Sequence, residues 1–379
     1  MLLYHTDIHY ARQRVDELNH EAWQSYLHHD VDALYAAREA EQLAREAGYI
    51  IGCADALQNQ ARCARVWADF RKSAELSRQA YELYEQANHR SGMADALSNM
   101  AFMHINLEEY ERALPLAVRA EQLANRSNHV AVQSFACLVK GMACEHLSQF
   151  DRALHNHRRA LDYSRSAQDE IGAASALLNI GIVMRKTGRL SSAMEYVNEA
   201  EHIFARHNIL LLMASAKYYQ AQLQEDSDEL DRAFELLQDA LAMVKKIRHA
   251  QGQGPLYLRM GAVRRKQLRY EEAEEYLLQS VELSRSYGKH QAECKGLLEL
   301  ALGYLARNKI PQAIATLDDA LATAEFHGLA GMQHMLQRHL GQAYAAKGQW
   351  RQAFLAMERA AQLQQELSRR YRSLASMLQ

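Results

Sequence analysis

A fixed period of 40 residues is the feature that most constrains the fold of this chain. One reference position holds a small residue in nine successive blocks: Ala33, Ser73, Ala113, Ala153, Ala193, Ala233, Ala273, Ala313 and Ala353. A second small residue follows seven residues later, from Ala40 to Ala360, and a third precedes the reference position by twelve residues, from Ala61 to Gly341. A period of this length indicates an array of stacked supersecondary units, which grows by adding units and not by dividing into globular domains.

Each block is predicted to contain two helices. The 379 residues include only 3 prolines, and alanine and leucine are abundant, which favours helix almost throughout. The second helix of each block is expected to stop at a residue that tolerates the left-handed conformation, as Gly and Asn do. These stops also recur every 40 residues: Gly48, Asn88, Asn128, Gln168, Asn208, Arg248, Gly288 and Gly328.

The small residues have a packing role, because two helices approach closely only where their side chains are short. The run GQAYAAKGQWRQA, from Gly341 to Ala353, carries the Gly, Tyr and Ala positions that make the pattern resemble the tetratricopeptide repeat. It departs from that repeat in its 40-residue period and in lacking the final proline. The resemblance covers residues 16–365 and extends to the lengthened variety found in scaffold proteins and in bacterial sensor arrays, ahead of diguanylate cyclase or histidine kinase modules. It implies an all-α, right-handed superhelix of about nine two-helix repeats.

The sequence divides into three predicted parts. Residues 1–15 form a lead-in, residues 16–365 form the repeat array, and residues 366–379 extend the last helix. From Trp350 onward there is no Gly or Pro, so this helix should continue past the usual stop. It is interpreted either as a cap on the array or as a coiled-coil stalk for homodimerisation or an output domain. Its apolar stripe consists of Leu363, Leu367, Tyr371, Leu374 and Leu378.

Catalysis is not expected from this sequence. It has no Gly-rich phosphate loop, no HExxH or GxSxG motif and no zinc-ligand spacing. The 18 histidines are scattered, and His155 and His157, two residues apart on a helix, point to different faces. No metal or other cofactor is therefore predicted.

Charge and cysteine content point to a cytoplasmic protein. The net charge of -2 gives no basic field for direct nucleic-acid binding. The 5 cysteines form no CxxC pair and no even-numbered set, which favours buried thiols in a reducing compartment. No apolar run approaches the length of a membrane span, and the N-terminal residues do not read as a signal peptide.

The resemblance implies a concave groove lined by the first helices, in which asparagines hold a peptide backbone. The position fourteen residues before the reference position reads Asn59, Asn99 and Asn179 in three repeats. An amide both donates and accepts hydrogen bonds, so such a ladder suits an extended peptide. The alternative is that these asparagines bond neighbouring helices to each other.

A basic strip is predicted in the middle of the same groove. It consists of Arg185, Lys186, Arg259, Arg265 and Lys266, and it would suit an acidic or phosphorylated peptide. Glu225 and Asp226 fall between the two basic pairs, so the alternative is a ladder of ion pairs between repeats. Arg264 takes a slot that holds tyrosine in the last two repeats, which made its repeat the first candidate for an anion.

Aromatic side chains are the remaining candidates for partner contact. They lie at or near predicted groove positions, where aromatics often act as binding hot spots, although an aromatic stripe in a helical array is also typical of a core. They are Phe102, Phe135, Tyr218, Tyr219 and Tyr257.

Two functions follow from these observations. The first is a non-catalytic module that holds a peptide or partner segment in its concave groove. The second is a regulatory sensor, of which a bacterial peptide-pheromone receptor is one kind, that transmits ligand binding through its long C-terminal helix.

Overall fold

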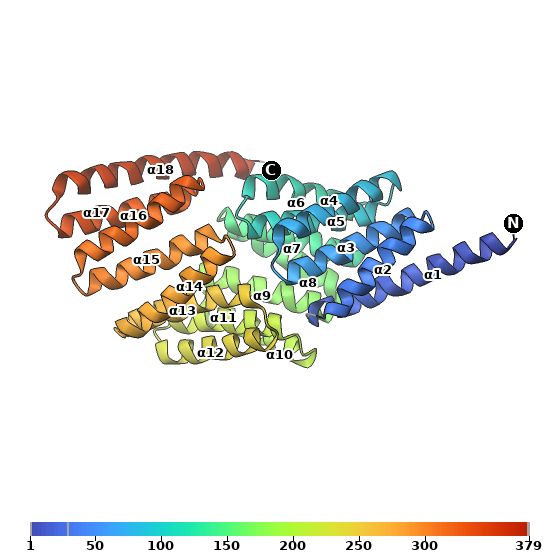
Figure 1. Cartoon of the computed structure of the whole chain (residues 1–379), viewed down its shortest axis with the longest axis horizontal. Helices are drawn as coiled ribbons and strands as arrows, with labels where there is room; N and C mark the ends of the chain where they lie inside the picture. Colours follow the sequence, from blue (N-terminus) through green and yellow to red (C-terminus); the bar gives the residue numbers. More distant parts are fainter. Residues whose placement is uncertain (1, 29, 377–379) are drawn as a thin grey trace. The chain divides into compact units, whose positions relative to one another are not determined.

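The protein is described by a computed structural model, which covers residues 2–28 and 30–376. These residues form α-helices connected by short turns, with one 3₁₀ helix at Tyr26–His28 and no β-strand in the described part of the chain (Figure 1). The chain forms two compact units. Unit 1 comprises residues up to 216 together with residues from 374 onward, and unit 2 comprises residues 217–373.

The helices alternate between the first and second helix of each repeat. The first helices are α1 (Leu2–Ser25), α3 (Ile50–Val66), α5 (Arg90–Asn106), α7 (Val130–His146), α9 (Glu170–Lys186), α11 (Leu210–Asp226), α13 (Ala250–Lys266), α15 (His290–Ala306) and α17 (Ala330–Ala346). The second helices are α2 (Val31–Glu46), α4 (Phe70–Gln86), α6 (Tyr110–Asn125), α8 (Phe150–Ser166), α10 (Leu190–Arg206), α12 (Leu230–Lys246), α14 (Tyr270–Ser286), α16 (Ile310–Phe326) and α18 (Trp350–Ser376).

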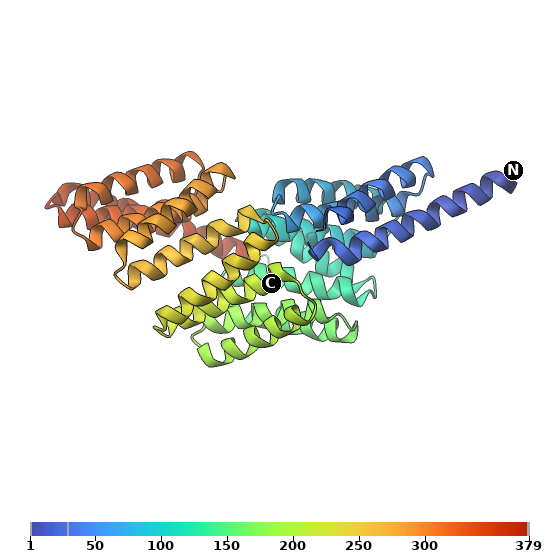
Figure 2. The ribbon, with the colours of Figure 1, turned by 60° about the horizontal axis from the view of Figure 1, so that its bottom comes forward.

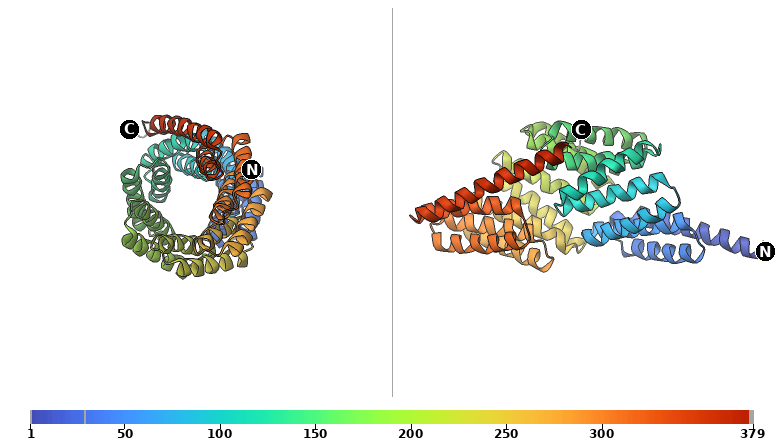
Figure 3. Two further views of the ribbon diagram at one scale, coloured as in Figure 1. Left: turned by 90° about the vertical axis from the view of Figure 1, so that its left-hand side faces the viewer. Right: turned by 90° about the horizontal axis from the view of Figure 1, so that it is seen from above.

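Consecutive helices pack side by side within each unit (Figures 2 and 3). First helices also touch one another across repeats. In unit 1 the pairs are α1 with α3, α3 with α5, α5 with α7 and α7 with α9, and in unit 2 they are α13 with α15 and α15 with α17. The first helices therefore form a shared face in each unit. The predicted all-α solenoid of two-helix repeats is confirmed.

The helices end where the 40-residue period places their stops. All eight predicted stop residues have positive φ, including Asn88 at 52° and Arg248 at 53°. After Tyr84 the backbone N–H of Asn88 bonds the carbonyl of Glu85, and that of His89 bonds the carbonyl of Tyr84. These are the two hydrogen bonds of the motif in which a left-handed residue ends a helix.

The small residues lie where the two helices of a repeat cross. The reference residues, from Ala33 to Ala353, are between 0% and 7% exposed. At Gly261 a Cβ atom would stand 2.5 Å from Cγ of Leu277 and 3.1 Å from the carbonyl oxygen of Ala273. Only a glycine fits there without displacing its neighbours, which is the role predicted for the small positions.

The two ends of the chain are helical. α1 begins at Leu2 and runs through the predicted lead-in, and α18 continues to Ser376. In the apolar stripe of α18, Leu363 is 3% exposed and Leu367 is partly exposed. The side chains of Tyr371, Leu374 and Leu378 lie outside the described part of the chain. The division into residues 1–15, 16–365 and 366–379 stays a prediction.

Candidate functional site

The predicted asparagine ladder lies on the first helices, and two of its members are buried. Asn59 is 3% exposed and donates to the backbone and side-chain oxygens of Asn19 at 3.0 and 3.2 Å. Asn99 is 1% exposed and donates to the hydroxyls of Ser77 and Ser73 at 2.7 and 3.1 Å. Both amides thus bond neighbouring helices, which is the arrangement that the alternative interpretation of the ladder expects.

The ladder differs at its two ends. Asn179 is partly exposed and donates to the backbone oxygen of Ser175 in its own helix, at 2.8 Å. Asn19 holds the same repeat position in α1, and its amide donates to the carbonyl of Gly52 at 3.0 Å. The sequence reasoning missed Asn19, although it lies 40 residues before Asn59 and the period alone identifies it.

The predicted basic strip consists largely of ion pairs. In unit 1, Lys186 contacts Glu145 at 2.7 Å, while Arg185 is partly exposed at the end of α9. In unit 2, the carboxylate of Glu225 lies 3.2 Å from Arg259 and 2.9 Å from Lys266. The plus, minus, plus order of adjacent repeats therefore produces direct pairing, as the ion-pair alternative expects.

The basic stretch around Arg264 is neutralised in the same way. Arg265 pairs with Glu299 at 2.9 Å, and Arg264 pairs with Glu272 at 3.1 Å while its guanidinium carbon stands 3.4 Å from the centre of the Phe234 ring. Each of these cations already has a carboxylate partner, so this repeat offers no uncompensated charge at Arg264 or Arg265.

The predicted tyrosines lie beside Arg259 in unit 2. Tyr218 and Tyr219 are partly exposed on α11, with ring centres 5.4 Å apart in an edge-to-face arrangement. The guanidinium of Arg259 stands 5.9 Å from the Tyr218 ring. Tyr257, in contrast, is 8% exposed and stacks on Tyr276, so it is part of the core.

Arg65 in unit 1 is the basic residue of this face that has no carboxylate partner among the described residues. Its guanidinium donates to the Asn99 side-chain oxygen at 3.2 Å and to the Tyr26 hydroxyl at 3.4 Å. Phe102 and Phe135 each place a ring centre 5.4 Å from its guanidinium carbon. Burial lowers the pKa of Arg65 below its ordinary value, although the group stays protonated at neutral pH.

The neighbouring Arg62 shows the contrast. Its guanidinium pairs with Asp95 at 2.5 Å and lies over the Trp23 ring at 4.2 Å. Asp95 also accepts a hydrogen bond from Gln58 at 2.9 Å. Asp95 is therefore committed to Arg62 and Gln58, and Arg65 holds its positive charge among aromatic rings and neutral oxygens.

An uncompensated guanidinium beside aromatic rings suits an anionic group with apolar neighbours. Arginine binds carboxylates or phosphates through two parallel N–H groups, and a charge kept partly from water interacts more strongly with an opposite charge. Arg65 is partly exposed, as are Tyr26, Phe102 and Phe135. We name these four residues the Arg65 cluster.

Sequence reasoning listed no role for Arg65, but a signal was present. At its repeat position the adjacent repeats carry Ser25 and Ile105, both uncharged, whereas Arg185 stands between Glu145 and Glu225. The sequence analysis weighed the density of basic residues, when the useful measure was the charge at the same position one repeat away.

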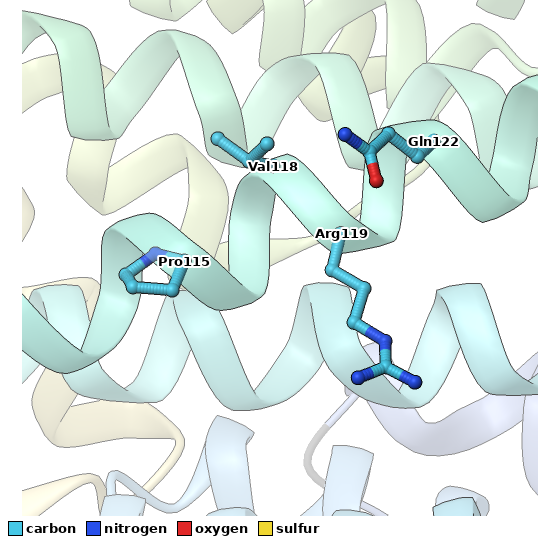
Figure 4. A pocket seen from close by; sticks show the side chains of 4 residues that line it. All are labelled: Pro115, Val118, Arg119 and Gln122. Atoms are coloured by element: carbon cyan, nitrogen blue, oxygen red, sulfur yellow. The ribbon is translucent and has the colours of Figure 1, made fainter. Parts of the chain in front are cut away.

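A shallow pocket lies on a second helix in unit 1, away from the Arg65 cluster. It is lined by Pro115, Val118, Arg119 and Gln122, all on α6 (Figure 4). The Arg119 guanidinium donates to the Tyr81 hydroxyl at 3.1 Å. One helix supplies the whole lining, and no buried polar group converges on it, so it is a weaker candidate than the Arg65 cluster.

The described residues contain no group of three or more His, Cys, Asp and Glu side chains placed to hold a metal ion. The five cysteines are buried as free thiols, and burial raises the pKa to about 11 for Cys63, Cys137, Cys144 and Cys294. They are thus protonated and unreactive at neutral pH. Among the described helices, none combines the length and apolar character needed to cross a bilayer.

Known proteins resemble this chain mainly in structure. Residues 253–325 match the tetratricopeptide repeat family. No curated protein sequence matches the chain. A Rap protein complexed with Competence and Sporulation Factor is 12% identical, with a TM-score of 0.70 over 94% of this chain and 99% of that one.

Two further structures match over nearly their whole length. The Rap conjugation gene regulator of plasmid pLS20, in complex with the Phr* peptide, is 15% identical, with a TM-score of 0.59 over 95% of this chain and 96% of that one. Aspartyl phosphate phosphatase F from Bacillus subtilis is 13% identical, with a TM-score of 0.57 over 93% of this chain and 94% of that one. At these identities the likeness shows a shared fold.

The matched segment and the rest of the array are built on one unit. Residues 253–325 fall within α13 to α16, and the same pair of helices recurs at the same 40-residue spacing on both sides. Small residues at the crossing and left-handed stops recur with it. The chain is a tetratricopeptide repeat protein.

Proposed function

We propose that the protein is a non-catalytic module that binds an extended peptide or a partner segment along its first helices. The observation that carries the proposal is the Arg65 cluster, where a buried positive charge lacks a carboxylate and is flanked by aromatic rings. The peptide would place an acidic side chain or its terminal carboxylate on Arg65 and an apolar side chain near Phe102 and Phe135.

Similar structures support this class of function. One is a complex with Competence and Sporulation Factor and another a complex with the Phr* peptide. A third is named a phosphatase, so the absence of catalysis here is part of the proposal and is checked by assay against phosphoaspartyl substrates. The cytoplasmic location also stays a prediction.

The residues predicted from the sequence take secondary places in this proposal. Asn59 and Asn99 would position the first helices, and Asn179 and Arg185 would lie along the same face of unit 1. In unit 2, Tyr218 and Tyr219 would contact the partner, and Arg259, Arg265 and Lys266 would do so only by exchanging the ion pairs that they now make.

Replacement of Arg65 by methionine should remove the preference for acidic peptides. Methionine keeps an unbranched apolar side chain among the aromatic rings and loses the charge. The probe is a fluorescent pool of hexapeptides containing one aromatic and two acidic residues, compared by polarisation with a pool in which Asn and Gln replace the acids. The wild type should bind the acidic pool about tenfold or more tightly, as expected for a buried ionic contact.

The matched control is Arg265→Met, which removes a cation that is already paired with Glu299 in unit 2. It should retain the preference of the wild type for the acidic pool. Equal affinity of the wild type and Arg65→Met for this pool, with both variants folded by circular dichroism, would contradict the proposal.

The alternative function is a regulatory sensor, and the length of α18 favours it. This helix has 27 residues, whereas α16 has 17. A helix that extends beyond its repeat suits transmission of a signal to a partner or output domain. On this account, peptide binding slows hydrogen exchange in α18; unchanged exchange there on saturation with the acidic pool leaves binding alone as the function.

A further inference from the structure

The last helix presents apolar side chains that the rest of the array covers. Trp350 is 72% exposed, Phe354 67%, Leu355 53% and Met357 47%. These four residues lie within the first eight positions of α18. An exposed apolar patch of this kind marks an interaction surface in a soluble protein.

Earlier repeats show what normally covers two of these positions. At the position of Phe354, Leu114 is 1% exposed, Phe234 4% and Ile314 9%. At the position of Met357, Leu277 and Leu317 are at most 1% exposed. In those repeats the following first helix packs on the second helix, as α17 does on α16. No described helix follows α18.

The first helix of the array ends it differently. Asp16 on α1 is exposed at a position where Ala56, Ala96 and Ala136 are fully buried. Terminal repeats of an array need a polar outer face for solubility, and α1 has one. The apolar end at α18 therefore requires a covering partner, whereas the end at α1 does not.

Two charged residues frame the apolar patch. Arg351 and Glu358 are exposed, and neither has an ion pair with any residue that the structure describes. They are seven residues apart, with Phe354 and Leu355 between them, so all four share one stripe of α18. If a second α18 packs antiparallel across a two-fold axis beside Phe354 and Leu355, Arg351 of each copy faces Glu358 of the other.

We propose that this face of α18 binds a second copy of the same chain, with the two α18 helices antiparallel. The patch is self-complementary, because its apolar centre meets itself and its two charges are opposite in sign across the two-fold axis. A head-to-tail arrangement would place Phe354 against the polar face of α1 and leave Asp16 buried without a partner.

The test is the concentration dependence of the sedimentation coefficient of the full chain. The wild type should sediment as a dimer at micromolar concentration, and Phe354→Glu with Leu355→Glu should sediment as a monomer. Phe326 is 86% exposed in the same unit, so Phe326→Glu is the matched control and should remain dimeric. A monomeric wild type at about 100 μM, well above the dissociation constants of most specific dimers, overturns the proposal.

Charge reversal tests the antiparallel arrangement itself. Arg351→Glu and Glu358→Arg should each weaken the dimer about tenfold or more, because each places like charges opposite one another. The double variant should restore the affinity to within about threefold, because both pairs are re-formed in the opposite sense. A double variant as weak as the sum of the two single variants would contradict the antiparallel pairing.

Discussion

Replacement of His157 by leucine should stabilise the protein, and the gain should grow as the pH falls. His157 is fully buried on α8, and neither ring nitrogen has a hydrogen-bond partner among the described residues. Burial lowers the pKa of His157 to about 3. The folded state therefore excludes a proton that the unfolded chain binds at its ordinary pKa near 6.5.

The sign of the effect follows from that difference. Above pH 6.5 both states carry a neutral imidazole, and below it only the unfolded state gains a proton, so stability falls as the pH falls towards 3. The loss is roughly 1.4 kcal/mol per pH unit, or about 3 kcal/mol at pH 4.5. Leu237, Leu277 and Leu317 occupy the same repeat position, so leucine fits this register.

The measurement is the free energy of chemical unfolding at pH 7.5 and at pH 4.5. At pH 7.5 His157→Leu should gain about 1–3 kcal/mol, because two unsatisfied polar atoms leave the core. At pH 4.5 the gain over the wild type should rise by about 3 kcal/mol. His155→Gln is the control, since His155 is exposed two residues away. An equal gain of His157→Leu at both pH values would contradict a buried neutral imidazole.

Replacement of Asn99 by alanine should destabilise unit 1 by about 2–4 kcal/mol. The substitution leaves the Ser77 hydroxyl without its donor and Arg65 without its acceptor, and it opens a cavity between helices. The measurement is the midpoint of urea unfolding. Hydrogen exchange in α5 shows whether the loss is local, because repeat arrays need not unfold in one step.

Asn179→Ala is the matched control for this prediction. Its amide is partly exposed and bonds only the backbone of its own helix, so the expected change is within about 0.5 kcal/mol. If Asn99→Ala costs no more than Asn179→Ala, the buried amide is not the inter-helix brace that its hydrogen bonds indicate. Loss of peptide binding in Asn99→Ala would then be read as direct contact.

The architecture could be predicted because every signal for it is local and repeated. A stop such as Asn88 needs only its own conformational tolerance, and a small residue such as Gly261 needs only the helix that crosses it. The alternation of charge at Glu225 was likewise visible, because a fixed period places equivalent residues of adjacent repeats next to each other.

The candidate site was harder to predict because it depends on which neighbours are absent. Arg65 differs from Arg265 only in its surroundings, since Asp95 is taken by Arg62 and the adjacent repeats supply no other carboxylate. Burial of His157 follows from its place seven residues before a stack of core leucines in later repeats, yet the absence of a hydrogen-bond partner is visible only in three dimensions.

The most direct test of the proposed binding face is a photocrosslink from its centre. p-Benzoylphenylalanine in place of Phe102 puts the reactive group beside Arg65, and the same residue in place of the exposed Arg78 on α4 reports a second-helix surface. The acidic hexapeptide pool should crosslink at position 102, in competition with unlabelled pool, and not at position 78. Crosslinking at 78 alone, or equal competition-resistant labelling at both positions, would contradict binding at the Arg65 cluster.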